Sequence, residues 1–455
     1  MYSLLSVQAT LNSIISVILA ILVLLIMITV HEFGHYIVGK IFKFKINEFA
    51  IGMGPAIFKK TNKQTGEVFS VRIFPLGGYC AFDGEDKDSE NESAFNNKHP
   101  LKRIAVLVSG ALMNLILGVL VLMLSVGIYG QLMLKVHDFK EDANYAGYSL
   151  ATNDVILKIE DKTIYMSTDI VDALNGKKQG DIVKITVQNG EDRCDRVVKL
   201  RNDVTSNSLT DNTSAFTAIG VATLEQITKT TSDSKFNSGD YVVKFDDVID
   251  YSTGTRIYEL KEVVLKAKTM QVGETLRLWV ISNNEKKQVF IPITKDLSLL
   301  NDSEVLTELG IVESTLVVNY SSQNVKFSFG ETIKRGFVYS FNVGTTIFRT
   351  LGELFTGKLG ISAVGGPITT ITATSSAIRF GGFNYFLEIL GFIGINLAIF
   401  NLLPIPALDG SRVVFCIIEA IRKKPLNRNI EGIIHGVGLL VLLGFCILVD
   451  ILQIF

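Results

Sequence analysis

The sequence predicts a multi-pass α-helical membrane protein with four transmembrane helices, a membrane-associated β-hairpin and two extracytoplasmic α+β domains. Three observations point to this class. Hydrophobic residues make up 48% of the 455 residues, and the mean hydropathy of +0.35 is high for a soluble chain. No charged residue occurs among residues 1–30, whereas residues 141–302 are rich in them. Long apolar runs alternate with polar segments, as in a membrane protein that carries a water-soluble insert.

Four apolar runs are long enough to cross the hydrocarbon layer as helices. About 20 residues, each rising about 1.5 Å, cover the roughly 30 Å thickness of that layer. A cleaved signal peptide is the alternative for the first run, but no positive segment precedes it and no small-residue cleavage site follows. The predicted spans occupy residues 1–40, 103–134, 385–410 and 432–455.

The distribution of Lys and Arg predicts the orientation of these spans. No basic residue precedes the first span, whereas residues 41–102 and residues 411–431 are rich in them. Basic loops stay on the cytoplasmic side. We therefore expect both loops in the cytoplasm, and both termini and the long insert after the second span outside it.

The insert contains one small domain twice. Residues 154–161 resemble residues 240–247, and residues 180–187 resemble residues 273–280. Each copy shows a strand opened by an acidic turn, a short helix, and an alternating strand after a Gly. The helices are expected near residues 169–174 and 258–267, and the domains at residues 135–210 and 211–300.

The element order of each copy resembles that of PDZ domains, in the bacterial form where a Gly- or Asn-Asp turn precedes the apolar strand. PDZ domains bind peptides by adding a strand to a sheet edge. Peptide binding is therefore one hypothesis for both copies. The alternatives are two β-rich spacers that bind nothing, or a pair that acts only as a size filter.

A fifth segment, residues 301–384, is predicted to be an extracytoplasmic amphipathic or re-entrant segment. Residues 359–378 are uncharged but rich in Ser, Thr and Gly, which favours a partly buried or re-entrant path over a crossing. Residues 340–376 are expected to contain an amphipathic helix on the outer membrane surface. Its predicted apolar face consists of Phe341, Ile347, Leu351, Leu354 and Phe355.

A metal-binding pattern directly follows the first apolar run. In His31-Glu32-Phe33-Gly34-His35, the two imidazoles lie on one helix face, so both can bind one metal ion. The intervening Glu32 is placed to take a proton from water at that ion. Ionisable groups at a membrane span are costly and usually functional. The alternative is a pair of interfacial histidines at a helix end.

A catalytic zinc site usually has three protein ligands, so a third is needed. Asp409 is the candidate, because the predicted topology ends both the first and the third span on the cytoplasmic side. Pro404 and Pro406 stop a regular helix just before it. The alternative for Asp409 is an Asp-Gly turn at a helix end, which the presence of His31 and His35 disfavours.

Together, these motifs resemble the site-2 protease family of intramembrane zinc metalloproteases. The histidine motif near the first span and Asn401–Gly410 at the third carry the resemblance. Residues 75–79 resemble the family's membrane-associated β-hairpin, and residues 366–368 its motif before the third span. Residues 109–114 resemble its second-span motif, with Ser and Ala in place of the usual Ala and Pro. The tandem insert resembles the bacterial regulator-of-sigma-E protease branch.

The resemblance implies a zinc metalloendopeptidase. Zinc (Zn2+) would be held by His31, His35 and Asp409, with Glu32 as the catalytic base. The family holds unwound substrate with its hairpin and its Asn-x-x-Pro-x-Pro segment, and the alternatives are a structural hairpin and a helix-capping Asn. The implied substrate contacts are Asn401, Pro404, Pro406, Gly77, Gly78 and Tyr79.

The resemblance also implies a location and partners. The chain would lie in the bacterial inner membrane and regulate signalling by cutting single-pass membrane proteins, either anti-sigma factors or signal-peptide remnants. A net charge of −1 gives no reason to expect nucleic-acid binding, and four scattered Cys exclude a disulfide scaffold. Two other classes are a membrane PDZ scaffold with a vestigial metal site and a metal transporter. The intact ligand set argues against the first, and the Pro-containing motif and the insert argue against the second.

Overall fold

The computed structural model describes nearly the whole chain in two compact units. The described residues are 2–85, 89–136, 147–201, 212–246, 257, 259–282, 285–318, 320–358 and 365–454. One unit comprises Met1–Gln131 with Lys326–Phe455, and the other comprises Leu132–Val325. The predicted boundary between residues 210 and 211 lies outside the described residues.

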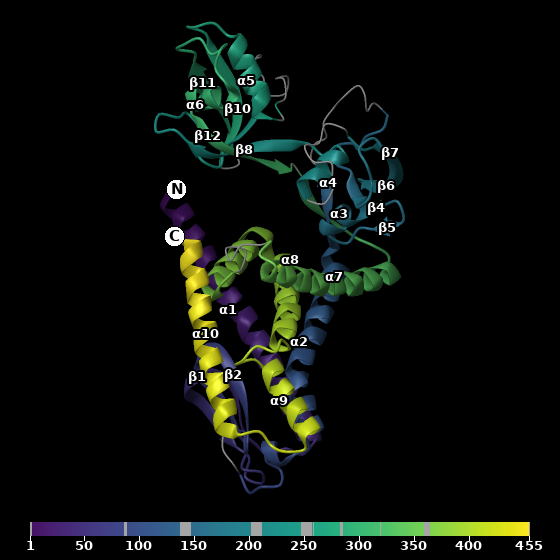
Figure 1. Ribbon diagram of the computed structural model, residues 1–455, viewed down its shortest axis with the longest axis vertical. Coiled ribbons are helices and arrows are strands. Elements are labelled where there is room, and N and C mark those ends of the chain that lie inside the picture. The colour runs from purple at the N-terminus through teal and green to yellow at the C-terminus, as the bar shows by residue number, and fades with distance from the viewer. Residues whose placement is uncertain are drawn as a thin grey trace. The chain divides into compact units, whose positions relative to one another are not determined.

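Four helices of the first unit are long and apolar enough to cross a membrane (Figure 1). They are α1 (Tyr2–Ile41), α2 (Pro100–Tyr129), α8 (Pro367–Asn401) and α10 (Arg428–Ile454). The described residues thus contain four candidate membrane-spanning helices, the number that the sequence predicts. Their apolar residues occur all around the helix rather than on one stripe, as expected for helices that face both protein and lipid.

Two of the predicted spans end earlier than expected. The helix α2 ends at Tyr129 instead of residue 134, because Gly130 takes a φ of +89° and the next residues form strand β3 (Gln131–Val136). The helix α8 ends at Asn401 instead of residue 410, since Pro404 and Pro406 cannot donate backbone hydrogen bonds.

The loop predicted at residues 411–431 is also largely helical. Helix α9 (Asp409–Arg422) begins at the predicted ligand itself and ends where Lys423 takes a positive φ. Its apolar side packs on a cluster that includes Cys416, Phe95 and Leu107. The basic residues that led to the prediction of a loop thus do not prevent the segment from forming a helix.

The segment predicted to be re-entrant is a helix from Pro367 onward and runs into the third span. Gly382 interrupts α8 with φ 67° and ψ −152°, a conformation open to glycine. Residues 359–364 of the predicted segment lie outside the described residues.

The predicted amphipathic helix exists but is displaced toward the N-terminus, as α7 (Phe329–Phe355). Of the residues predicted for its apolar face, Leu351 and Leu354 are partly buried, and the side chain of Phe355 lies outside the described residues. Val343 and Ile347 are buried, whereas Phe341 is 65% exposed, together with Phe337 and Phe348. One face of α7 therefore packs within the unit, and another exposes aromatic rings, which suits a helix at a lipid surface.

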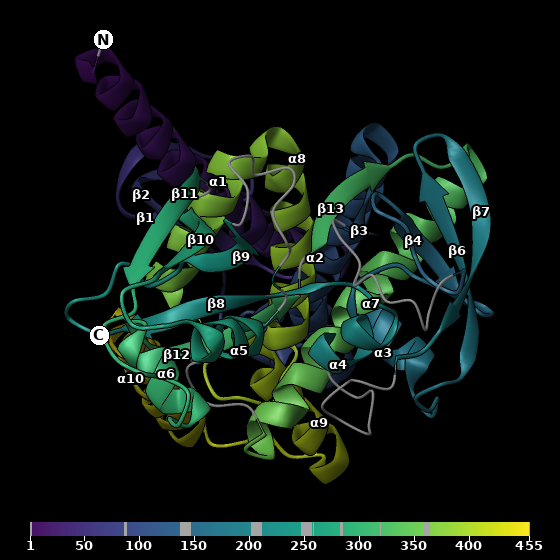
Figure 2. The same ribbon diagram turned by 90° about the horizontal axis from the view of Figure 1, so that it is seen from above.

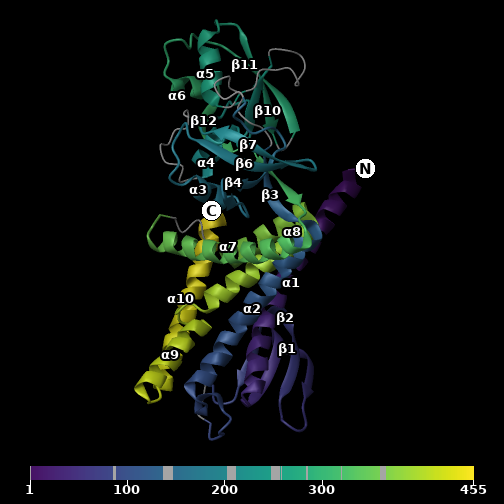
Figure 3. The ribbon, with the colours of Figure 1, turned by 90° about the vertical axis from the view of Figure 1, so that its right-hand side faces the viewer.

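The hairpin consists of β1 (Ile46–Thr61) and β2 (Val68–Phe82), which lie beside α1 in Figure 3. Both strands bend, so the two form four paired segments in the order 78–82, 46–51, 68–74 and 56–61. The two outer pairings are antiparallel, whereas 46–51 and 68–74 run in the same direction. Gly52, Gly54 and Gly77 take positive φ at the bends. Among the described residues, segment 78–82 is paired on one side only. A short 3-10 turn, η1 (Phe95–Asn97), leads from the hairpin to α2.

The second unit contains two sheets. The first has the order β13-β3-β4-β6-β7, and the second has the order β11-β10-β9-β8-β12, which Figure 2 shows from above. Besides β3, the strands of the first sheet are β4 (Val155–Ile159), β5 (Lys162–Thr163, paired with β4), β6 (Ile182–Asn189), β7 (Asp192–Lys199) and β13 (Tyr320–Val325). The helices in the same part of the chain are α3 (Thr168–Leu174) and α4 (Asn212–Ala218). The second contains β8 (Thr223–Thr230), β9 (Tyr241–Phe245), β10 (Thr275–Ser282), β11 (Glu285–Pro292) and β12 (Ile311–Val318), with helices α5 (Leu260–Thr269) and α6 (Asp302–Glu308).

The sequence repeat corresponds to a structural repeat. In both copies a strand, a helix and two further strands follow one another, as β4-α3-β6-β7 and as β9-α5-β10-β11. Asp154 and Asp240 open the first strand of each copy, are buried, and each accept a backbone N–H from three residues earlier at 2.8 and 2.9 Å. The residue before each, Asn153 or Gly239, takes a positive φ. The repeated Asp is thus a turn-forming residue in both copies.

The second domain extends beyond residue 300, where the prediction ended it. Asn301 forms a capping box with Glu304 at the start of α6, and β12 then pairs with β8. The next strand, β13, returns to the first sheet beside β3. The sequence signals for these elements were the Asn-x-x-Glu pattern and Gly310. In the structure, Gly310 takes a φ of +93°.

Candidate metal centre

The C-terminal part of α1 brings the two histidines of the motif together. Because residues four apart lie on one helix face, His31 Nε2 and His35 Nε2 are 3.0 Å apart, with the ring planes at 86° to each other. Both side chains are buried, each residue being 7% exposed. Two imidazole nitrogens thus converge on one point within the helical unit.

Asp409 completes this cluster from the start of α9, 378 residues along the chain from His31. Its Oδ2 lies 2.9 Å from His31 Nε2 and 3.4 Å from His35 Nε2. Zinc ligands arranged as a tetrahedron at about 2.0–2.1 Å from the ion are about 3.3 Å from each other. Two imidazoles and one carboxylate therefore fit zinc in both spacing and chemistry, and they leave a fourth position open. Within the described part of the chain, these three side chains form a cluster whose ligand atoms lie close enough together to bind one metal ion.

Two glycines allow α1 and α2 to approach at this point. A Cβ on Gly110 of α2 would lie 2.5 Å from His35 Nε2 and 2.8 Å from His31 Cε1. A Cβ on Gly34 of α1 would lie 2.4 Å from the carbonyl oxygen of Ser109. Sequence reasoning assigned neither glycine a role, although Gly34 lies inside the histidine motif and Gly110 inside the second-span motif.

Hydrogen bonds fix how the two rings present their nitrogens. His35 Nδ1 donates to the carbonyl oxygen of Val106 at 2.8 Å, which leaves His35 Nε2 for a metal. The side-chain amide of Asn401, the last residue of α8, lies 3.3 Å from His31 Nδ1. The atom at this distance is the amide nitrogen Nδ2. An amide turned by 180° would instead accept the ring N–H with its oxygen and leave His31 Nε2 for the same ion. Asn401 thus contacts a predicted ligand directly.

Glu32 lies between the ligand cluster and the hairpin. It is half-buried, and its Cγ would be 3.7 Å from a Cβ on Gly78 of β2. The backbone N–H of Cys80 donates to its carboxylate. Glu32 therefore faces both the metal cluster and the hairpin segment that has one unpaired side.

The chain matches the model of Peptidase family M50 over residues 19–445. It belongs to this family. A relative named Regulator of sigma E protease, from Haemophilus influenzae, is 26% identical over 448 residues, covering 94% of this chain and 96% of that protein. Relatives named zinc metalloproteases include one from Fusobacterium nucleatum, 24% identical with 95% and 96% covered, and one from Vibrio cholerae, 27% identical with 92% and 93% covered.

Membership in family M50 confirms the predicted metalloprotease and its zinc. It also supports a membrane location, in agreement with the four apolar helices of the described residues. The scaffold and transporter hypotheses are therefore set aside. The ligand atoms of His31, His35 and Asp409 in this M50 protease suit zinc, the metal in the names of its relatives.

The predicted substrate residues of the M50 protease are only partly brought together. Asn401 lies at the ligand cluster, and Gly78 lies beside Glu32. Gly77 forms a bend at φ +99° against Met53. Of the remaining three, Pro404 is exposed, Pro406 packs against α10, and Tyr79 belongs to the polar group described next.

A polar group stiffens the hairpin of the M50 protease near its bend. Glu48 Oε1 accepts from Ser70 Oγ at 2.6 Å and from Arg72 Nη2 at 2.8 Å. The Arg72 guanidinium lies 5.3 Å from the centroid of the Tyr79 ring. Burial raises the pKa of the Glu48 carboxyl, but hydrogen bonds from Ser70 and Arg72 outweigh burial and hold this pKa below its usual value. The Tyr79 side chain thus has a structural role, while its backbone belongs to segment 78–82.

Proposed function

We propose that this metalloprotease cleaves single-pass membrane proteins within the bilayer and so performs regulated proteolysis of anti-sigma factors or signal-peptide remnants. One observation carries the proposal: His31, His35, Asp409 and Glu32 converge where membrane-type helices meet. The name of the relative from Haemophilus influenzae supports the sigma-factor branch of the proposal. The zinc ligands would be His31, His35 and Asp409.

The roles of the side chains follow from their positions. Bound zinc lowers the pKa of water toward about 7 and polarises a carbonyl group. Glu32 would accept the proton of the attacking water and pass it to the leaving amide nitrogen. Val106 and Asn401 would hold the two imidazoles in the orientation that directs both Nε2 atoms inward.

The hairpin would hold the substrate in an extended form, because a helical substrate hides its carbonyls. Segment 78–82 is paired on one side only and lies next to Glu32. A substrate strand added to this edge would therefore pass the catalytic base. Gly77 and Gly78 carry no side chain that would keep a substrate backbone away, and Asn401, Pro404, Pro406 and Tyr79 complete the proposed contacts.

The orientation and the insert form a second part of the proposal. The chain would lie in the bacterial inner membrane. The basic segments support an orientation with the hairpin and α9 on the cytoplasmic side. Both termini and the two repeated domains would then be extracytoplasmic. The repeat of element order supports PDZ-like domains that either bind peptides or exclude substrates with bulky outer domains.

Glu32→Gln tests the catalytic assignment. We expect zinc content like that of the native protein and a loss of cleavage of roughly 100-fold or more, because the amide keeps the shape but cannot accept the proton. Cleavage of a purified single-pass substrate and zinc analysis of the same sample measure both effects. Glu92→Gln, at an exposed position between β2 and η1, is the matched control and should cleave normally. Normal cleavage by Glu32→Gln would refute the mechanism.

A further inference from the structure

The segment that carries Asp409 to the other ligands has an unusual backbone. Residues 402–408 connect α8 to α9, and Ala407 takes a φ of +81°, in the left-handed region that favours glycine. Such a conformation persists only where the surroundings hold it. Ala407 is two residues before Asp409, so whatever holds Ala407 also directs the proposed ligand.

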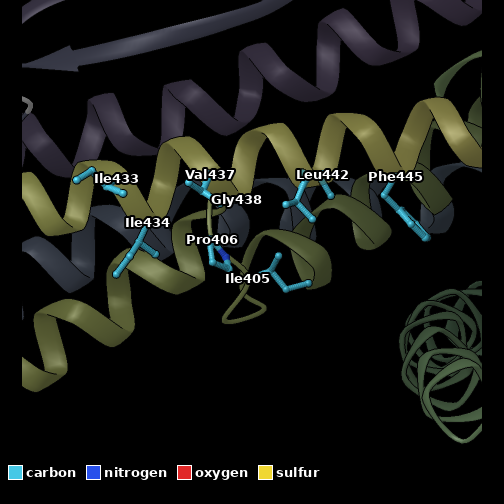
Figure 4. Close-up of a pocket in the computed structure, with 9 residues that line it drawn as sticks. Ile405, Pro406, Ile433, Ile434, Val437, Gly438, Leu442 and Phe445 are labelled. Carbon is cyan, nitrogen blue, oxygen red and sulfur yellow. The ribbon is translucent and has the colours of Figure 1, made fainter.

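The helix α10 holds this segment through two residues that are three apart. The backbone N–H of Ala407 donates to His435 Nδ1 at 3.2 Å. At Gly438 the α10 backbone touches the segment so closely that a Cβ would lie 2.2 Å from Pro406 Cβ. Figure 4 shows Ile405 and Pro406 beside Val437 and Gly438 of α10. The hydrogen bond and the close contact act on adjacent residues of the segment.

The ring of His435 has a defined orientation. It stands edge-on to Phe415 of α9, with ring centroids 5.5 Å apart and planes at 85°. Because Nδ1 accepts from Ala407, the ring proton is on Nε2, and this buried atom has no hydrogen-bond partner among the described residues. A polar ring in an apolar span is costly, and an incompletely satisfied one requires a reason.

Dense packing of α10 does not supply that reason. Only 6% of its most apolar stretch is buried, against 44% for α2 and 50% for α8. The polar contact to Ala407 is thus one of the few specific attachments of this helix.

We propose that His435 is a positioning residue for Asp409. By accepting the Ala407 N–H, it holds the left-handed backbone that presents the Asp409 carboxylate to His31 and His35. The inference rests on the proposed zinc site. Without the acceptor, the Ala407 N–H loses its partner and the segment relaxes, so zinc is held less tightly although all three ligands remain.

The full-length protein in detergent allows a test with His435→Asn and His435→Gln. The Asn amide oxygen reaches the place of Nδ1, whereas the Gln amide oxygen reaches the place of Nε2. We expect His435→Asn to release zinc to a chelator at close to the native rate. We expect His435→Gln to release zinc roughly tenfold faster or more, as for other lost partners of metal sites. The absorption spectrum of bound Co2+ should change in the Gln variant and not in the Asn variant.

Asp409→Asn separates this inference from the proposed function. Native zinc affinity in that variant would overturn the zinc site itself. Weak zinc binding by Asp409→Asn, with equal release rates for His435→Asn and His435→Gln, would overturn only the positioning role. The same holds if both His435 variants lose zinc equally, since a merely structural histidine does not distinguish the two amides. A lowered kcat with little change in KM in the Gln variant would further support positioning.

Discussion

The helices α2 and α10 are both long and apolar, yet they pack in opposite ways. In α2, Gly110 touches the histidine rings and Gly118 touches the backbone of α8. In α10, a Cβ on Gly436 or Gly444 would meet no described atom within 4 Å, and Gly438 is the close contact. The helix α2 therefore packs closely both at the metal cluster and against α8, whereas α10 makes close contact at a few points. Apolarity alone does not show this difference.

The largest effect is expected from a substitution at the close contact between α1 and α2. Gly110→Ala places a Cβ where it overlaps His35 Nε2, so we expect zinc loss and about a 100-fold fall in kcat/KM, since small displacements of catalytic groups have effects of this size. Metal analysis and substrate cleavage measure it. Gly444→Ala on α10 is the matched control and should leave both unchanged. Full zinc content in Gly110→Ala would contradict the close approach.

Two leucines compare the helices in stability. Leu122 of α2 is 1% exposed, and Leu440 of α10 is 72% exposed. Leu122→Ala should lower the free energy of unfolding by about 2–5 kcal/mol, because it leaves a cavity in a packed core. Leu440→Ala should change it by less than about 0.5 kcal/mol, since lipid or detergent replaces the lost contacts. Unfolding in detergent measures both, and similar losses would show that α10 is packed as α2 is.

The smallest expected effect concerns the attachment of α10 near its C-terminal end. Asp450 accepts from the backbone N–H groups of Ile368 and Thr369 at 3.1 Å each, and from Thr369 Oγ1 at 2.8 Å. It thus caps the N-terminus of α8. Asp450→Ala should cost about 1–2 kcal/mol of stability, a typical value for a lost cap. Asp450→Asn keeps an acceptor and should cost less; an equal cost in the two variants would argue against capping.

The metal cluster was largely predictable because its rules are local or topological. His31 and His35 follow from helix periodicity, and Asp409 follows from two spans that run in the same direction. The roles of Gly34 and Gly110 were not predictable, because the atoms that a glycine approaches belong to another helix. The position of Asn401 against His31 depends on where α8 ends, which is nine residues before the predicted end.

The elements that the sequence misplaced share a physical cause. Residues 132–134 continue the apolar run of the second span, but Gly130 takes a positive φ and the following residues pair as a strand with β4 and β13. The four-segment form of the hairpin depends on pairing between distant residues, which alternation alone does not reveal. The PDZ-like identity of the repeats, the orientation and the substrate contacts remain predictions.

One feature of the second unit concerns how its chain begins and ends. The strand β3 leads in from α2, and β13 leads out toward α7, and the two are neighbours in one sheet. Neighbouring strands lie about 4.8 Å apart. The nearly two hundred residues between them thus form a cassette with adjacent entry and exit. A few residues could bridge its ends, so different outer domains could be exchanged at this junction without lengthening the connection between α2 and α7.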